Sequence, residues 1–230
     1  MILRRTTLTL AATALCGITS AAVDPGAASA PRMEFTPPSA GSYTLQKIQK
    51  VTDATLLDPS ARPVRLSAVT TSKLTLLTFF YTYCADPIGC PFAFRTLTEV
   101  RRLVLTDPGL SQEVRIVSVS LDPTTDTPEA IGRYRAMATR GSALEWDFLT
   151  TASVPELLPV LDDFGQDVSV ERGVDGAAER TVHHMLKMFL IDREGSVREI
   201  YTLAYLQPAV IFNDIKTLWL EERQRGRPAA

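Results

Sequence analysis

The chain has 230 residues, of which 45% are hydrophobic and 22% are charged, a usage typical of a globular protein. Its formal net charge is −2 and it has no long basic run, which argues against a nucleic-acid partner. The length suits one domain of roughly 150–200 residues with flanking tails.

The first residues have the layout of a secretory signal. Arg4 and Arg5 precede a short apolar stretch (8–18), and small residues follow it as far as Ala22. The apolar stretch is shorter than the roughly 20 residues that a membrane-spanning helix needs. We therefore predict a signal peptide at 1–22 and an exported, periplasmic or otherwise extracytoplasmic protein. An uncleaved membrane anchor, which would keep the protein membrane-associated, is the alternative.

The amino-acid composition divides the mature chain into a linker, a folded domain and a tail. Residues 23–43 are rich in Ala, Pro, Ser and Gly and are predicted to form a flexible linker. Residues 44–222 contain the periodic apolar patterns and are predicted to form one folded domain. Residues 223–230 are predicted to be a loose tail.

The domain is predicted to begin with a hairpin, whose two short strands (55–57 and 64–66) flank an Asp-Pro-Ser turn. A strand at 74–83 follows, and its unbroken run of Leu, Phe, Thr and Tyr favours a parallel sheet buried on both faces. Helically spaced apolar residues after Pro91 predict a helix with that proline at its first position. VRIVSVSL (114–121) predicts a second buried strand.

The second half of the domain continues this alternation. The predicted elements are a helix (127–140), a helix that begins with a capping box at Ser153 and ends at Gly165, a polar loop (171–180), two strands joined by a short turn (184–191 and 197–203), and a closing helix (208–222). Strand, helix, strand, helix, strand pair and helix is the order of a thioredoxin-like fold. We predict an α/β protein of this type with the hairpin as an N-terminal extension.

Cys84 and Cys90 lie at the junction between the first buried strand and its helix. Parallel α/β sheets bind ligands beyond the carboxyl ends of their strands, so both sulfurs are placed at the usual reactive end. Cys90 is expected to be the more acidic thiol, because a helix N-terminus favours thiolate. Three interpretations are open: a structural disulfide, a redox-active dithiol, and a site for a soft metal ion such as Cu(I), or for Zn.

A metal site needs a third ligand, and the two histidines of the chain, His183 and His184, are adjacent. Neighbouring residues of a strand point to opposite faces, so one histidine alone should face the thiols. Lys187 shares the face of His183 and favours solvent there, which leaves His184 as the candidate ligand. Met185 and Met188 are interpreted as core residues of the same strand.

Asp122 and Asp126 follow the second buried strand at the same end of the sheet. They are interpreted as a turn and a helix cap. An acidic contact close to the cysteine loop is the alternative. Trp146 and Trp219 are interpreted as packing residues.

Taken together, these segments resemble the Sco/SenC family of thioredoxin-like copper proteins. The likeness spans roughly residues 45–220. It rests on the strand that leads into a Cys…Cys-Pro loop, on LDPTTDTPEAIGRY (121–134) with WDFLT (146–150), and on HMLKMFLIDREG (184–195). One departure is clear, since the family usually spaces its cysteines Cys-x-x-x-Cys and this chain has five residues between them.

The resemblance implies copper as the cofactor, with Cys84, Cys90 and His184 as ligands and the two cysteines as the redox-active pair. It implies a copper chaperone rather than a turnover enzyme. Its partner would be the subunit that carries a copper site of cytochrome oxidase, which would bring the protein close to a membrane. A metal-independent thiol–disulfide oxidoreductase is the alternative. The two differ in one respect, because a copper site needs the histidine and a dithiol couple does not.

Overall fold

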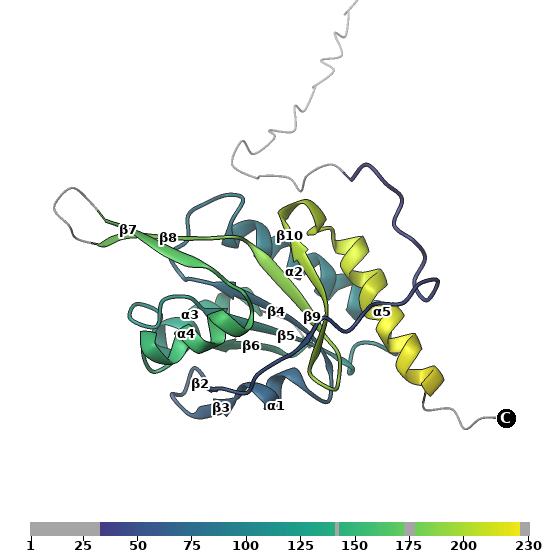
Figure 1. The fold of residues 1–230 in the computed structure, drawn as a ribbon, viewed down its shortest axis with the longest axis horizontal. Helices are drawn as coiled ribbons and strands as arrows, with labels where there is room; N and C mark the ends of the chain where they lie inside the picture. The colour runs from purple at the N-terminus through teal and green to yellow at the C-terminus, as the bar shows by residue number, and fades with distance from the viewer. Residues whose placement is uncertain (1–32, 141–142, 173–177, 226–230) are drawn as a thin grey trace, which may run out of the picture.

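The computed structural model describes residues 33–140, 143–172 and 178–225 (Figure 1). A six-stranded sheet forms its centre, in the order β1-β10-β9-β4-β5-β6. These strands are β1 (Gln49–Lys50), β4 (Leu74–Phe80), β5 (Val114–Ser120), β6 (Trp146–Leu149), β9 (Lys187–Ile191) and β10 (Ser196–Thr202). Within the described ranges, no helix combines the length and the apolar character needed to cross a membrane.

The pairing of the strands confirms the thioredoxin-like fold. β4 pairs in parallel with β5, and β5 pairs in parallel with β6. β9 lies antiparallel to both β4 and β10, with Thr78 opposite Met188. Every residue of β4 and β5 is buried, as expected for parallel strands that are covered on both faces.

The helices follow the predicted order. They are α1 (Leu66–Thr70), α2 (Cys90–Leu105), α3 (Pro128–Ala138), α4 (Val154–Asp163) and α5 (Pro208–Arg225), with a short 3₁₀ turn, η1 (Leu203–Tyr205), before α5. Gly89 is the N-cap of α2, so Cys90 is its first residue and Pro91 its second. The capping box predicted at Ser153 is wrong, because its side chain makes no capping hydrogen bond to α4.

Two neighbouring residues at the end of β4 divide the aromatic core between the two faces of the sheet. Phe79 contacts Phe164 and Phe189, with ring centroids 5.5 and 6.3 Å away. Phe80 belongs to a separate cluster on the side of α2 and α3, which also contains Phe94, Tyr134, Trp146 and Phe148. Both clusters lie directly beneath the end of β4, where the cysteine loop begins, and give that loop a rigid base.

The second half of the chain differs from the prediction in one region. Residues 171–180 were expected to be a loop, but β7 (Val168–Arg172) and β8 (Ala178–His184) form a two-stranded ribbon there. Figure 1 shows this ribbon projecting from the body of the domain. The single strand predicted at 184–191 is therefore wrong, since it is divided between β8 and β9.

The N-terminal extension has the expected hairpin, with β2 (Thr55–Leu57) paired to β3 (Pro63–Arg65). The end of the predicted linker contacts α5: the Gly41 N–H donates to Thr217 Oγ1 at 2.9 Å, and the Tyr43 hydroxyl donates to Asp214 at 2.5 Å. The predicted signal peptide lies outside the described residues.

Candidate functional site

The cysteine loop leaves the carboxyl end of β4 and is held there by a buried carboxylate. Asp126 accepts hydrogen bonds from the Thr82 backbone N–H at 3.1 Å, the Thr82 hydroxyl at 2.5 Å and the Ser120 hydroxyl at 2.7 Å. Its side chain is inaccessible to solvent, and burial raises its pKa. Thr127, and not Asp126, caps α3 by accepting from the Ala130 N–H at 3.4 Å. Asp126 therefore fixes the first residues of the loop.

Asp122 supports the same loop from its other side. It accepts a hydrogen bond from the Tyr83 hydroxyl at 2.7 Å and others from the backbone N–H groups of Thr124 and Thr125 at 3.1 and 3.3 Å. The predicted turn at Asp122 is thus confirmed. The alternative, an acidic contact close to the cysteine loop, holds as well, since the carboxylate positions the residue directly before Cys84.

The loop between Cys84 and Cys90 folds back on itself. The Gly89 N–H donates to Asp86 O at 3.0 Å, and the Ile88 N–H donates to Asp86 Oδ1 at 3.1 Å. A Cβ at Gly89 would lie 3.3 Å from Cys84 Sγ, which is closer than ordinary packing allows. Both cysteines are free thiols, and they are hydrogen-bonded to each other. The longer spacing therefore still brings the two sulfurs together.

The two thiols have opposite acidities. Hydrogen bonds from the Cys90 thiol, the Tyr81 hydroxyl and the backbone N–H groups of Cys90 and Asp86 lower the pKa of Cys84 to about 5. The pKa of Cys90 is raised, because its thiol is hydrogen-bonded to Cys84 and is only 1% exposed. The expectation that Cys90 is the more acidic thiol is wrong. The backbone N–H of Cys90, at the start of α2, donates to the Cys84 sulfur and lowers the pKa of Cys84 instead.

His184 lies on the same cavity as Cys84. This cavity has a volume of about 700 Å³, and its lining also includes Tyr81, His183 and Met185. The Tyr81 ring lies between the two candidate ligands: its centroid is 6.0 Å from that of His184, and its hydroxyl is hydrogen-bonded to Cys84. His183 is exposed, whereas His184 is partly buried.

One ring nitrogen of His184 is already engaged. Its Nδ1 is 3.2 Å from the Val182 carbonyl, and since a carbonyl can only accept, Nδ1 carries the proton of that hydrogen bond. In a neutral imidazole with this tautomer, Nε2 presents a lone pair to a metal. This atom is buried and has no hydrogen-bond partner within the described part of the chain. A buried polar atom without a partner is costly, so a ligand for Nε2 is expected.

The backbone around His184 is held by the turn that follows α4. The side-chain amide of Gln166, itself buried, donates to Met185 O at 3.0 Å, and Lys187 Nζ donates to Gly165 O at 2.6 Å. Met185 was expected in the core but is 60% exposed, because the chain leaves β8 at this point. Met188, one strand later, is fully buried as predicted.

The donor set suits a soft ion, since it combines a thiolate, a second thiol and a neutral imidazole. In residues 33–140, 143–172 and 178–225, however, no three His, Cys, Asp or Glu side chains are close enough together to hold a metal ion. The two cysteine side chains interact with each other, and Cys84 and His184 line one cavity. The structure does not bring all three side chains into contact.

Comparison with known proteins identifies the family of the chain. The model of the family described as SCO1/SenC matches residues 40–220. This chain belongs to the SCO1/SenC family. The search of curated proteins found no significant match.

Several solved structures of Sco proteins share the fold. Apo Sco1 of Thermus thermophilus is 28% identical, with 76% of this chain and 95% of that chain covered and a TM-score of 0.60. ScoI of Bradyrhizobium japonicum, solved with copper bound, is 24% identical over 74% and 99% of the two chains, with a TM-score of 0.59. BsSco, described as having a disulfide switch and belonging to a family of cytochrome c oxidase assembly proteins, is 23% identical over 76% and 96%, with a TM-score of 0.57.

Proposed function

We propose that this SCO1/SenC protein is an exported copper chaperone that binds copper through Cys84, Cys90 and His184. Two observations carry the proposal: the buried Nε2 of His184 lacks a partner among the described residues, and His184 and Cys84 line the same cavity. The copper-bound structure of a Sco relative supports the choice of metal.

Copper would be the cargo of this site, bound by two sulfurs and one imidazole nitrogen. Cys84 is prepared as a thiolate at neutral pH, because its pKa is lowered to about 5. Cys90 keeps its proton in the metal-free protein and must release it to become a ligand, so binding is expected to release a proton. Tyr81 and Gly89 keep the Cys84 sulfur oriented toward Cys90 and the cavity.

The partner we propose is the subunit that carries a copper site of cytochrome oxidase. The support is family membership and the description of BsSco as belonging to a family of cytochrome c oxidase assembly proteins. The export signal at 1–22 would place the protein on the side of the membrane where such a site is exposed. N-terminal sequencing of native protein tests this, with a first residue near Val23 expected.

The alternative, a metal-independent thiol–disulfide oxidoreductase, is favoured by one specific observation. A low-pKa, partly exposed Cys84 beside a buried, protonated Cys90 is the arrangement of an attacking and a resolving thiol. In that function His184 has no part.

Anaerobic titration of the reduced, signal-free protein with Cu(I), in competition with a chelator, distinguishes the two functions. A copper chaperone should bind about one Cu(I) per chain, and its oxidised form should bind far less, because a disulfide sulfur is a poor ligand. If the reduced protein binds no Cu(I) but reduces a disulfide substrate, the oxidoreductase function holds instead.

A further inference from the structure

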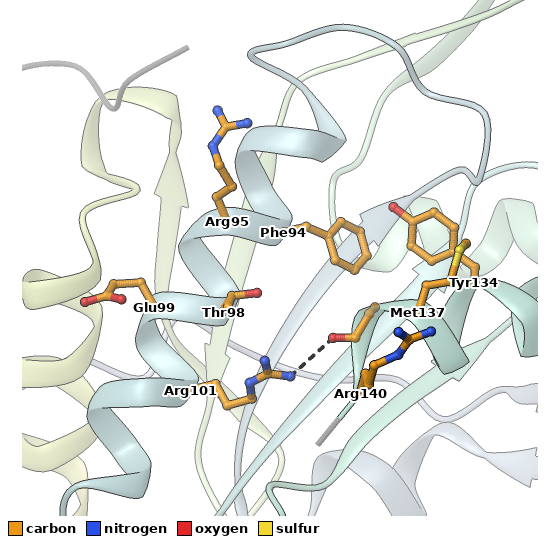
Figure 2. Close-up of a pocket in the computed structure, with 9 residues that line it drawn as sticks. Phe94, Arg95, Thr98, Glu99, Arg101, Tyr134, Met137 and Arg140 are labelled. Atoms are coloured by element: carbon orange, nitrogen blue, oxygen red, sulfur yellow. Dashed lines mark hydrogen bonds between the residues drawn. The ribbon is translucent and has the colours of Figure 1, made fainter. Parts of the chain in front are cut away.

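A second cavity, of about 600 Å³, lies between α2 and α3 (Figure 2). It shares no lining residue with the cavity at Cys84. Arginines and apolar side chains line it together, namely Arg95, Arg101, Arg140, Phe94, Tyr134 and Met137. Phe94 and Tyr134 belong to the aromatic cluster around Phe80, but that packing does not account for the arginines beside them.

Two of the arginines direct their guanidinium groups into the cavity. Figure 2 shows the Arg101 guanidinium directed from α2 toward α3 and the Arg140 guanidinium beside Met137, whereas Arg95 points away. Arg101 is held in place, because it donates to Ala138 O at 3.3 Å and lies 5.6 Å over the ring of Trp146. Arg140 is exposed and belongs to the segment that follows α3.

These two positive charges have no carboxylate partner in the part of the chain that the structure describes. Glu99 is the acidic residue of the lining, but its carboxylate is paired with Arg102 at 2.7 Å, and Figure 2 shows it directed away from the cavity. Like charges in one cavity repel each other, so an anion placed between them would be stabilised. Guanidinium groups match carboxylates and related oxyanions in geometry.

The rest of the lining indicates what the anion is attached to. Phe94 and Tyr134 present aromatic rings whose centroids are 5.2 Å apart, and Met137 is 66% exposed beside them. A bare inorganic anion would leave this apolar floor uncovered. The volume lies within the roughly 300–1,000 Å³ of small-molecule sites.

We propose that the cavity between α2 and α3 binds a small organic anion, with its carboxylate or other oxyanion group on Arg101 and Arg140 and its apolar body on Phe94, Tyr134 and Met137. The proposal is independent of copper binding. A free soluble molecule and an anionic lipid both combine an oxyanion with an apolar body. The experiment below distinguishes these two kinds of ligand.

The test is a titration of the reduced, ¹⁵N-labelled, signal-free protein with 4-phenylbutyrate, followed by amide chemical shifts. Saturable shifts are expected in α2 and α3. The uncharged 4-phenylbutanol lacks the charge-assisted hydrogen bonds, and inorganic phosphate lacks the apolar body that would cover the rings. Each should bind at least about tenfold more weakly, since either contribution is worth that much. Absence of saturable shifts with 4-phenylbutyrate would overturn the proposal, as would equal binding of 4-phenylbutanol.

Substitutions in the cavity test which side chains bind 4-phenylbutyrate. Arg101→Gln combined with Arg140→Gln should weaken 4-phenylbutyrate binding by at least about tenfold, whereas Arg133→Gln, an exposed arginine of α3 that pairs with Glu129, should change it by less than about twofold. Met137→Glu places a carboxylate over the cavity from an exposed position, so it should abolish binding without disturbing the fold even if the double variant folds poorly. Equal losses in the double variant and Arg133→Gln would refute the assignment.

Vesicles of phosphatidylglycerol test whether the anion is part of a lipid. Sedimentation of the wild type with vesicles, lost in the double variant and reduced by 4-phenylbutyrate, would assign the site to an anionic lipid. Binding of 4-phenylbutyrate without sedimentation supports a free soluble anion.

Discussion

The Cys84 sulfur accepts a hydrogen bond from the Cys90 thiol, so the two cysteines of the reduced protein share one proton. The proton stays with Cys90, which is buried, while Cys84 is partly exposed and receives further hydrogen bonds from Tyr81 and the loop backbone. The reactive thiolate is therefore the first cysteine of the pair, although the second one starts the helix.

This asymmetry predicts a single thiolate in the reduced protein at neutral pH. Thiolate absorbance should rise with a midpoint near pH 5, the pKa of Cys84. Cys90→Ser replaces the strongest donor to Cys84 with a hydroxyl and should move that midpoint upward. Two thiolates that titrate together near the usual cysteine value would contradict the assignment.

The same pKa makes the stability of the reduced protein depend on pH. The pKa of Cys84 is lower in the folded state than its ordinary value of 9.0, so folding favours the deprotonated form. The free energy of unfolding, relative to Cys84→Ser, should rise between about pH 5 and pH 9 and be lost as the pH falls through about 5. Urea unfolding of both proteins across this range measures the difference.

The two histidines should differ in their effect on copper. His184→Ala removes the buried nitrogen that lacks a partner among the described residues, and we expect a loss of Cu(I) affinity of at least about tenfold, or about 1.4 kcal/mol. His183→Ala, the matched control at an exposed position, should cost much less. Competition with a Cu(I) chelator measures both. Unchanged affinity in His184→Ala would favour the dithiol oxidoreductase.

Gly89 is predicted to control the approach of the two sulfurs. A methyl group there would lie 3.2 Å from Asp86 Cβ and 3.3 Å from Cys84 Sγ, so the loop must shift in Gly89→Ala. We expect weaker Cu(I) binding and a loss of about 1–3 kcal/mol in stability, the usual cost of overpacking. Gly132→Ala meets Pro59 at a similar 3.3 Å away from the thiols and should leave copper binding unchanged.

Asp126 should be needed for the stability of the cysteine loop. In Asp126→Asn one carboxylate oxygen becomes an NH2 group, which cannot accept, so one of the buried donors of Thr82 and Ser120 loses its acceptor. We expect a loss of about 1–3 kcal/mol in the free energy of unfolding. Asp122→Asn should cost less, because Asp122 is only partly buried and water can replace its partners. Equal losses in urea titrations would show that burial of Asp126 does not matter.

The sequence predicted the central elements because their signals are local. The apolar runs of β4 and β5 and the periodicity of α2 need no information from distant residues. Cys84, Cys90 and His184 were found by residue type and by their place at strand ends.

The missed features depend on contacts far apart in the chain. β6 is only four residues long, and Trp146 was recognised as a packing residue without its strand. The two strands of the ribbon, VSVER and AERTVHH, are rich in polar residues, so their composition indicated a loop. The hydrogen bond from Thr82 to Asp126 joins side chains 44 positions apart, which no local pattern connects.

The division between β8 and β9 has a mechanical consequence. Cys84 and Cys90 are attached to the central sheet and to α2, whereas His184 is the last residue of the projecting ribbon. Only Met185 and Leu186 separate that ribbon from β9. The Gln166 side chain holds Met185 O, so the position of the imidazole depends on the turn after α4, whereas the positions of the sulfurs depend on β4 and α2. A substitution at Gln166 is therefore expected to disturb the histidine and to leave the cysteine pair in place.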